Sequence, residues 1–144
     1  MSTRACYVFK HENQNDVRKN DITIYKHHDG YPAGAISWIK AAKDYGNKLP
    51  ADEFGENLIY ERDKMVTGFM ACPEITNSAK WFTDNYKDHG DLSYHYVIYG
   101  DTTVEIWQHN YHVVGDKIED KVELIFLGDI EDAVKEYVPA EEVA

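Results

Sequence analysis

The chain has few cysteines, and it lacks the sequence signatures of common catalytic and metal-binding sites. Its 144 residues include only Cys6 and Cys72. Two thiolates are too few to form a zinc site alone, and neither cysteine has a base close in sequence that would activate it. Phosphate-binding glycine loops, Gly-x-Ser-x-Gly elbows, His-Glu-x-x-His pairs and Cys-x-x-Cys pairs are missing. The sequence therefore predicts no cofactor, and it assigns no reaction through a known motif.

Long apolar runs and basic residues are also scarce. No stretch approaches the ~20 apolar residues that cross a bilayer, and the first residues do not resemble a secretory signal. Asp and Glu number 26 against 15 Lys and Arg, which gives a net charge of −11. A surface of this sign repels phosphate backbones, so we expect no direct nucleic-acid binding, and the lack of long apolar runs predicts no membrane association. The charge indicates either solubility alone or an acidic face that competes with nucleic acid for a basic protein.

Histidine is plentiful by comparison, because the chain has seven. In a strand His27 and His28 point to opposite faces and cannot both ligate one ion, and the same holds for His109 and His112. We therefore expect no metal site. The residues considered for one are His27, His28, Asp29, His89, Asp91, His95, His109 and His112.

The hydrophobic pattern changes period several times over the length of a single domain. Alternating apolar residues predict strands, the first two as a hairpin with a long tip, at 5–10, 21–27, 66–72, 92–99, 102–111 and 121–127. Helical spacing predicts helices at 34–45, with Gly46 as its stop, at 51–61, and at 129–137, capped by Asp129. Residues 73–87 fit either a helix or a loop.

These elements predict an α+β fold in one domain. We expect an antiparallel sheet of four to five strands packed against two to three helices over residues 1–138, followed by a frayed acidic tail at 139–144. The helix at 34–45 should lie on one face of the sheet and bury Trp38 and Ile39.

An aromatic cluster is expected where Gly100 and Asp101 form a tight turn between two strands. In this hairpin Tyr94, Tyr96 and Trp107 share one face. Either a helix covers the cluster as core, or the cluster is an exposed platform for a base or a protein partner, which suits the half-polar side chains of Tyr and Trp. With Tyr31 and Asp91, these three residues are the predicted binding residues.

The segment at 25–34, from Tyr25 to Gly34, combines two imidazoles, a carboxylate, two glycines and a proline. It joins a strand to a helix, which is a position where backbone N–H groups and short polar side chains can converge on a ligand. His27, His28 and Asp29, together with the distant His89, are candidates for acid–base cleavage of a phosphoester. The alternative is that they are turn and capping residues. We expect Asp29 to accept backbone hydrogen bonds within 29–34, and Gly30 to be difficult to replace if it needs a positive φ.

Three segments carry a family resemblance. Residues 24–35 read IYKHHDGYPAGA, residues 49–54 read LPADEF, and residues 89–96 read HGDLSYHY. Over roughly residues 4–110 the chain resembles a family of small uncharacterised proteins from bacteriophages, prophages and bacteria. Those proteins carry a Tyr-x-His-Trp-Asp-Gly-Tyr-Pro-x-Gly turn and a His-Gly-Asp-Leu-x-Tyr-x-Tyr motif. His28 replaces the tryptophan here, and the tip at 11–20 and the acidic C-terminal part lie outside the pattern.

The resemblance implies a phage-related context and no particular reaction. We therefore expect a non-enzymatic binding protein, a counter-defence or host-takeover inhibitor in the bacterial host cytoplasm. It would occupy a basic, nucleic-acid-binding surface of a host protein or sequester a small nucleotide ligand. The alternative is a small enzyme acting on a nucleotide or phosphoester through a His/Asp site. A virion structural protein is less expected, because the chain has no repeats or coiled-coil segments.

Overall fold

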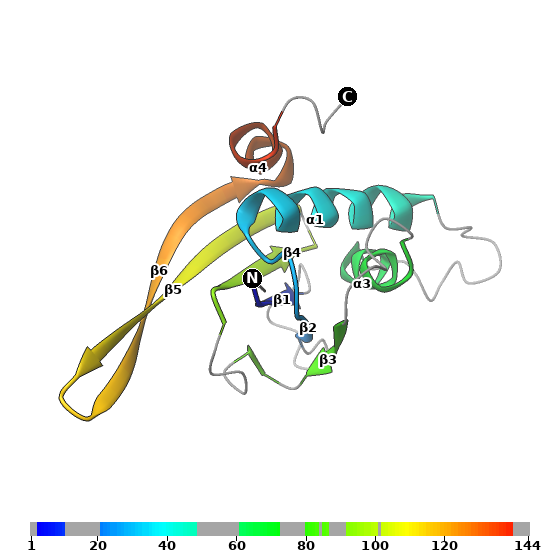
Figure 1. Ribbon diagram of the computed structural model, residues 1–144. Helices are drawn as coiled ribbons and strands as arrows, with labels where there is room; N and C mark the ends of the chain where they lie inside the picture. The colour runs from blue at the N-terminus through cyan, green and yellow to red at the C-terminus, as the bar shows by residue number, and fades with distance from the viewer. Residues whose placement is uncertain are drawn as a thin grey trace.

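The computed structural model describes residues 3–10, 21–48, 61–72, 80–83, 85–86, 92–100 and 102–139. They form an α+β domain in which one six-stranded sheet packs against three helices (Figure 1). The sheet order is β3-β2-β1-β4-β5-β6. Its strands are β1 (Ala5–Lys10), β2 (Ile22–Lys26), β3 (Lys80–Thr83), β4 (Tyr94–Tyr99), β5 (Thr103–Val114) and β6 (Lys117–Asp129). The helices are α1 (Pro32–Asn47), α3 (Glu61–Ala71) and α4 (Ile130–Tyr137).

The sheet is mixed, which corrects the expected antiparallel arrangement of four to five strands. β1 and β2 form the expected antiparallel hairpin, but β1 runs parallel to β4, with Tyr7 opposite Tyr96. Parallel neighbours need a long crossover connection, and the chain between β1 and β4 contains α1 and α3. The parallel pair therefore depends on which strands meet in space, and local periodicity carries no signal for that choice.

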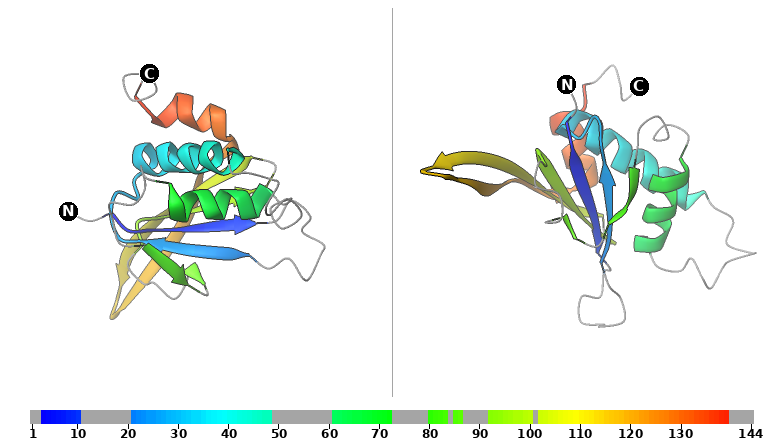
Figure 2. Two further views of the ribbon diagram at one scale, coloured as in Figure 1. Left: turned by 90° about the vertical axis from the view of Figure 1, so that its right-hand side faces the viewer. Right: turned by 60° about the horizontal axis from the view of Figure 1, so that its bottom comes forward.

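All three helices lie on one side of the sheet (Figure 2). The face they cover carries Tyr7, Phe9 and Ile106, and all three side chains are fully buried. Phe69 of α3 packs on Tyr7 with ring centroids 4.6 Å apart. Ile39 of α1 is buried as expected. Trp38 is only partly buried at the margin of this core, and the Lys26 Nζ atom lies 3.5 Å from its ring centroid.

Helix α3 replaces the short strand that the sequence predicts at 66–72. Its buried residues Met65, Val66 and Phe69, with Cys72 just past its end, recur at helical spacing. Contact with α1 and β1 therefore favours a helix despite the β-branched Val66 and Thr67. The strand β3 lies in a region that the sequence assigned to a helix or a loop. The predicted helix at 51–61 lies outside the described residues except for Glu61, where α3 begins.

Two glycines let α1 and α3 approach closely. A Cβ atom on Gly46 would collide with the Lys64 carbonyl, and one on Gly68 would collide with the Ala42 carbonyl. Helix α1 continues through Asn47. Gly46 is therefore a packing residue inside the last turn of the helix, and the prediction that it stops the helix is wrong.

The β4–β5 hairpin has a different register from the expected one. Ile98 pairs with Val104 and His95 pairs with Trp107, so three residues, 100–102, connect the strands. Thr102 adopts φ 76°, and its N–H donates to the Tyr99 carbonyl at 3.0 Å. A three-residue loop with its last residue in the left-handed region is a common hairpin connection. A register shift of one residue moves side chains to the other face of the sheet. Trp107 therefore lies on the face opposite to the one that carries Tyr94 and Tyr96.

β5 and β6 extend beyond the other strands as a twisted two-stranded arm (Figure 1). Asp129 ends β6 and caps α4 as predicted, because its carboxylate accepts a hydrogen bond from the Glu131 N–H at 2.9 Å. Within the described residues, no helix is both long enough and apolar enough to cross a membrane.

Candidate functional site: a pocket and arm on the helix-free face

The sheet face opposite the helices contains a pocket of about 350 Å³. The strands place its walls, because alternate residues of β1, β2, β4 and β5 point to this side. Its aromatic lining is contributed by Tyr86, His95, Tyr99 and Trp107, and its charged lining by Lys10, Asp21 and Glu105. Tyr86 also packs on a small cluster of Cys6, Tyr25 and Leu92 beside the pocket.

The Glu105 carboxylate is held in place by two donors. The Tyr99 hydroxyl donates to Oε2 at 2.6 Å, and the Trp107 indole N–H donates to Oε1 at 2.8 Å. Lys10 pairs with Asp21 at 3.1 Å. Among the described lining residues, two carboxylates and one ammonium leave one net negative charge. This pocket therefore favours a cation over an anion.

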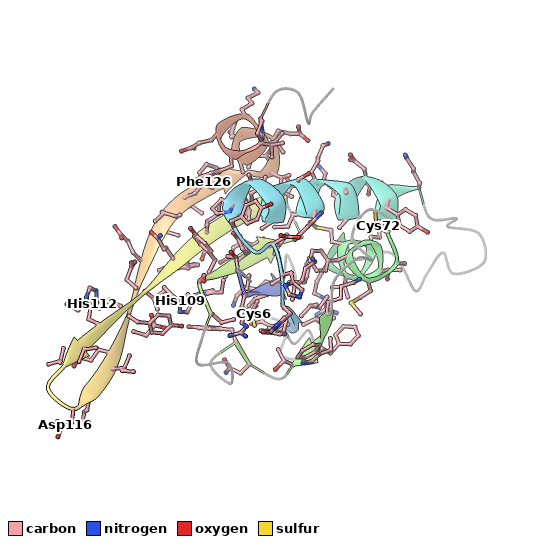
Figure 3. The ribbon with its side chains drawn as sticks, in the orientation of Figure 1. Cys6, Cys72, His109, His112, Asp116 and Phe126 are labelled. Carbon is pink, nitrogen blue, oxygen red and sulfur yellow. The ribbon has the colours of Figure 1, made fainter. Side chains whose placement is uncertain are left out.

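His95 connects the pocket to the arm through a hydrogen-bonded chain. Its Nδ1 lies 2.8 Å from Nε2 of His109, and Nδ1 of His109 lies 2.6 Å from the Asp120 carboxylate of β6. Figure 3 shows His109 at the root of the arm. The His95 ring stacks with Tyr86, with ring centroids 4.1 Å apart, and lies parallel to the Trp107 ring, with centroids 5.7 Å apart. This hydrogen-bonded chain, His95–His109–Asp120, fixes the arm to the body and orients the His95 ring.

Burial sets the charge of this histidine. Loss of hydration, with a smaller effect of His109, lowers the pKa of His95 from 6.5 to about 4, so the ring is neutral at pH 7. An ionised Asp120 only accepts, so the His109 Nδ1 carries hydrogen. The His95 Nδ1 and His109 Nε2 atoms share one hydrogen, and the tautomers of the two rings set which of them donates it; the second ring nitrogen of His95 is Nε2. Among the described residues Nε2 has no hydrogen-bond partner, and the His95 side chain lines the pocket.

The structure describes only part of the predicted catalytic set. His27, His28 and Asp29 follow β2 in sequence, with the His27 and His28 rings 4.6 Å apart and perpendicular. The Tyr25 hydroxyl lies 2.9 Å from Nδ1 of His27. His89 lies outside the described residues, as does the predicted binding residue Asp91. Whether His89 joins this turn stays a prediction.

The turn has a different backbone from the expected one. Asp29, and not Gly30, adopts a positive φ, of 58°. A Cβ atom on Gly30 would lie 2.6 Å from the Ala5 Cβ and 2.9 Å from the Thr3 carbonyl oxygen, so this glycine is needed for close approach. No hydrogen bond from residues 29–34 to the Asp29 carboxylate is found among the described residues. The prediction of a capping Asp29 is therefore wrong; the N-cap residue of α1 is Tyr31, which makes no side-chain cap.

The predicted binding residues separate into two groups. Tyr96 is fully buried, and its hydroxyl donates to the Gly30 carbonyl at 2.5 Å, so it holds the turn and cannot contact a partner. Tyr94 packs beside it at the edge of the helix-covered core. Trp107 lines the pocket on the opposite face, and Tyr31 is exposed at the start of α1. The expected Tyr94–Tyr96–Trp107 cluster is therefore not formed.

Sequence reasoning missed Glu105, Tyr86 and the His95–His109–Asp120 chain as a site. His95 and His109 were weighed only as metal ligands. No group of three or more His, Cys, Asp or Glu side chains in the described part of the chain could hold a metal ion. The available signal was the i, i+2 spacing of Glu105, Trp107 and His109, which places them on one strand face. It becomes informative only with the correct register across β4.

The helix-free face continues along the arm, where large apolar side chains are exposed. Val113 pairs with Ile118, and these two side chains are 79% and 72% exposed. Directly opposed residues share a face, so alternation from Trp107 and His109 places this pair on the helix-free face. Further exposed apolar residues on the same face are Tyr111, Val122, Leu124 and Leu127. We call these six residues the arm surface.

The arm is anchored at its root and free of the body at its tip. The Tyr111 hydroxyl donates to the Leu92 carbonyl at 2.6 Å, and the His109 N–H donates to the Ser93 carbonyl at 2.9 Å. Beyond this point every residue from 111 to 120 is exposed. Figure 3 shows His112 along the arm and Asp116 near its tip, away from the helices.

Comparison with known proteins adds no family to this description. Protein-family models, curated proteins and solved structures were compared with the chain, and no significant match was found in any of the three.

Proposed function

We propose that this chain is a non-enzymatic binding protein that docks a basic protein partner through its helix-free face. The observation that carries the proposal is the arm surface, an apolar stripe on a ribbon that extends away from the body. A two-stranded ribbon is marginally stable alone in water, and a contiguous exposed apolar patch is typical of an interaction site. The arm surface and the pocket lie on one face and can contact the same partner.

Charge supports a basic partner. Between residues 116 and 123 the arm carries four carboxylates and two lysines, and the whole chain carries a net charge of −11. Complementary charge accelerates encounter and selects against acidic competitors, while apolar contacts supply most of the affinity. A basic surface that normally binds nucleic acid fits this description.

The biological setting follows from the sequence resemblance. Small acidic proteins of phage type often act by binding host proteins, so we place this one in the bacterial host cytoplasm. There it would act as a counter-defence or host-takeover inhibitor. It would compete with nucleic acid for the host protein, because its acidic surface and the phosphate backbone attract the same basic residues.

The alternative is a small enzyme acting on a nucleotide or phosphoester, and one observation favours it. The His95–His109–Asp120 chain could pass a proton from His95 Nδ1 to His109 when His95 Nε2 takes up a proton from a ligand. Against it, the net negative pocket repels phosphate. His95→Gln should abolish turnover of a nucleotide or phosphoester if this alternative holds, with the fold intact by circular dichroism.

The binding proposal is tested with substitutions on the two sides of the arm tip. Val113→Asp with Ile118→Asp places charge on the arm surface, whereas Val114→Asp places one on the opposite side, at a residue that is 53% exposed. The wild type and each variant are used as bait in bacterial lysate, and the captured protein is then purified for titration. We expect the wild type and Val114→Asp to bind it alike, and the double variant to bind at least about tenfold more weakly.

The negative charge that the Asp substitutions add distinguishes lost apolar contact from lost electrostatic attraction. A basic partner is attracted by extra carboxylates, so weakened binding of the double variant indicates lost apolar contact. Wild-type affinity should also fall as salt is raised from about 50 to about 300 mM, a range that screens exposed charges. Equal binding by all three proteins would overturn the proposed docking face. Concentration-dependent dimerisation in light scattering, abolished only by the double variant, would instead assign this face to a second copy of the chain.

A further inference from the structure

We infer that the pocket on the helix-free face binds a guanidinium group, the side chain of an arginine on the docking partner. The inference rests on the proposed function, because that function supplies the partner and brings it to this face. It adds the chemical group that the pocket recognises. Three features of the lining carry it: the placement of its hydrogen-bond acceptors, its net charge, and its parallel aromatic rings.

The hydrogen-bond acceptors for the guanidinium are the two carboxylate oxygens of Glu105. From the residues that the structure describes, each oxygen of Glu105 accepts one hydrogen bond, Oε2 from Tyr99 and Oε1 from Trp107. A carboxylate has about four lone-pair sites, so each oxygen can accept a second bond. The two donors fix the carboxylate before any ligand arrives. A fixed carboxylate with one open site on each oxygen matches the two parallel N–H donors of a guanidinium.

His95 adds an uncharged ring to the same pocket. Its Nδ1 faces His109, which directs its Nε2 away from the His95–His109–Asp120 chain. A neutral histidine neither repels a cation nor attracts an anion. In the described part of the chain, the other rings stacked with or parallel to this ring are those of Tyr86 and Trp107, which are uncharged.

The aromatic rings select for a planar cation. The Tyr86 and His95 planes differ by 17°, and the His95 and Trp107 planes differ by 6°. A guanidinium is planar, is weakly hydrated and stacks on aromatic faces, whereas an ammonium is a compact and strongly hydrated charge. The Trp107 indole N–H already donates to Glu105. A ligand in the pocket therefore contacts the π-face of the indole. The lining therefore favours arginine over lysine.

The charge balance excludes an anion as the preferred ligand. Lys10 could attract a phosphate, but Asp21 neutralises it at 3.1 Å. Glu105 then leaves the lining net negative. A nucleotide would have to place its phosphates beside this carboxylate, which is unfavourable.

The test is a titration of the folded chain with Nα-acetyl-arginine-amide, followed by the indole N–H signals of the three tryptophans in NMR. Trp107 lines the pocket, whereas Trp38 lies on α1 and Trp81 lies on β3, so the chain contains two internal controls. We expect the Trp107 signal alone to shift with saturation. The citrulline analogue, which is similar in shape and uncharged, and the lysine analogue should each bind at least about fivefold more weakly.

Two variants establish the site. Glu105→Gln removes the charge and should weaken the arginine probe by about tenfold. Trp107→Phe removes the indole reporter and part of the stacking surface, and its binding is followed by calorimetry. Glu136→Gln, at an exposed carboxylate on α4, removes the same charge and should bind like the wild type. Loss of chemical-shift dispersion in Glu105→Gln would mark a folding defect. In that case the affinity of Trp107→Phe for the arginine probe decides whether the pocket is the binding site.

The outcomes separate this inference from the proposed function. No Trp107 shift with the arginine probe, or an equal shift with citrulline, overturns the guanidinium inference even if the arm variants lose the partner. A Trp107 shift with adenosine monophosphate in place of arginine overturns it in favour of the nucleotide alternative. A partner-derived peptide that binds more tightly than its Arg→Lys form supports the docked arginine. Equal affinity for free arginine and for that peptide would overturn the docked arginine and assign the pocket to a free small ligand.

Discussion

The two faces of the sheet are closed by different interactions, although the same strands supply both. On the helix-covered face, Tyr7 and Phe9 meet Phe69 of α3 and are fully buried. On the helix-free face, Glu105 and His95 are held by hydrogen bonds, and the pocket between them opens to solvent. Stability is therefore concentrated on one face. The other face is left with oriented polar groups and exposed apolar side chains that suit recognition.

The difference follows from the two-residue period of a strand. Tyr7 and Val8 are neighbours in sequence but face opposite sides, as do Ile106 and Trp107. Burying one set against helices needs only apolar volume. The other set must satisfy its polar groups within the sheet, which requires partners at defined distances. The contrast can be tested by perturbing each face separately.

The largest effect is expected from truncating the covered face. Phe69→Ala should lower the free energy of unfolding by about 3–5 kcal/mol, because it leaves a cavity against Tyr7 and Phe9. Trp107→Ala on the helix-free face should lower it by less than about 2 kcal/mol, since that side chain is only partly buried. Urea denaturation followed by circular dichroism measures both. Equal losses would show that the two faces contribute alike.

The next effect is a pH dependence confined to the helix-free face. The pKa of His95 falls from 6.5 to about 4 on folding, so between these values the unfolded chain binds a proton that the folded chain does not. Stability therefore rises with pH across this window and is lost on acidification, by at most roughly 3 kcal/mol from His95. The comparison is urea unfolding of wild type and His95→Gln at about pH 4.5 and pH 7, which span most of that window.

Other groups titrate in the same range, so the informative quantity is the difference between the two proteins. All other ionisable groups are present in both proteins. We expect a shallower loss on acidification for His95→Gln. A parallel loss in both proteins would mean that His95 is not the group that burial holds neutral.

A smaller effect is expected at the turn that the covered face supports. Gly30→Ala places a Cβ against Ala5 and the Thr3 carbonyl, and should cost about 1–3 kcal/mol. Asp29→Gly relieves a positive φ and should change stability by less than about 1 kcal/mol. Thermal unfolding of the two variants ranks them. A larger loss for Asp29→Gly would restore a structural role for the Asp29 carboxylate.

The smallest effects are expected from two buried tyrosines of the covered face, and they should have opposite signs. The Tyr96 hydroxyl donates to the Gly30 carbonyl, so Tyr96→Phe should destabilise by about 1 kcal/mol. The Tyr7 hydroxyl is buried with no hydrogen-bond partner among the described residues, so Tyr7→Phe should be neutral or stabilise by up to about 1 kcal/mol. Chemical denaturation gives both values. Destabilisation by Tyr7→Phe would indicate a partner for that hydroxyl.

Local patterns predicted much of the secondary structure. The alternation at Ile22 and Ile24, the helical spacing of Ala35 and Ile39, and the capping Asp129 all correspond to observed elements. Each depends on interactions within a few residues. The strand predicted at 66–72 was wrong, because this segment belongs mostly to α3. Val66 and Thr67 favour strands by propensity, but contacts with α1 and β1 outweighed that preference.

The candidate site was much less predictable. The shift from a two-residue to a three-residue hairpin loop moved Trp107 to the face of His95 and away from Tyr96. The histidine chain then needed the β5–β6 pairing, which places Asp120 within reach of His109. No local pattern contains either register, since each is settled by pairing between segments distant in the chain.

The sequence by itself determined the α+β class, most of the strands, the body of the helix that it placed at 34–45, and the net charge of −11. These depend on composition and on periodicity along the chain. Only the tertiary structure decided the parallel β1–β4 pair, the face that Trp107 occupies, and the meeting of His95, His109 and Asp120. The reason is that strand order and register minimise the free energy of the whole packed domain, and a shift of one residue exchanges the two faces of a strand.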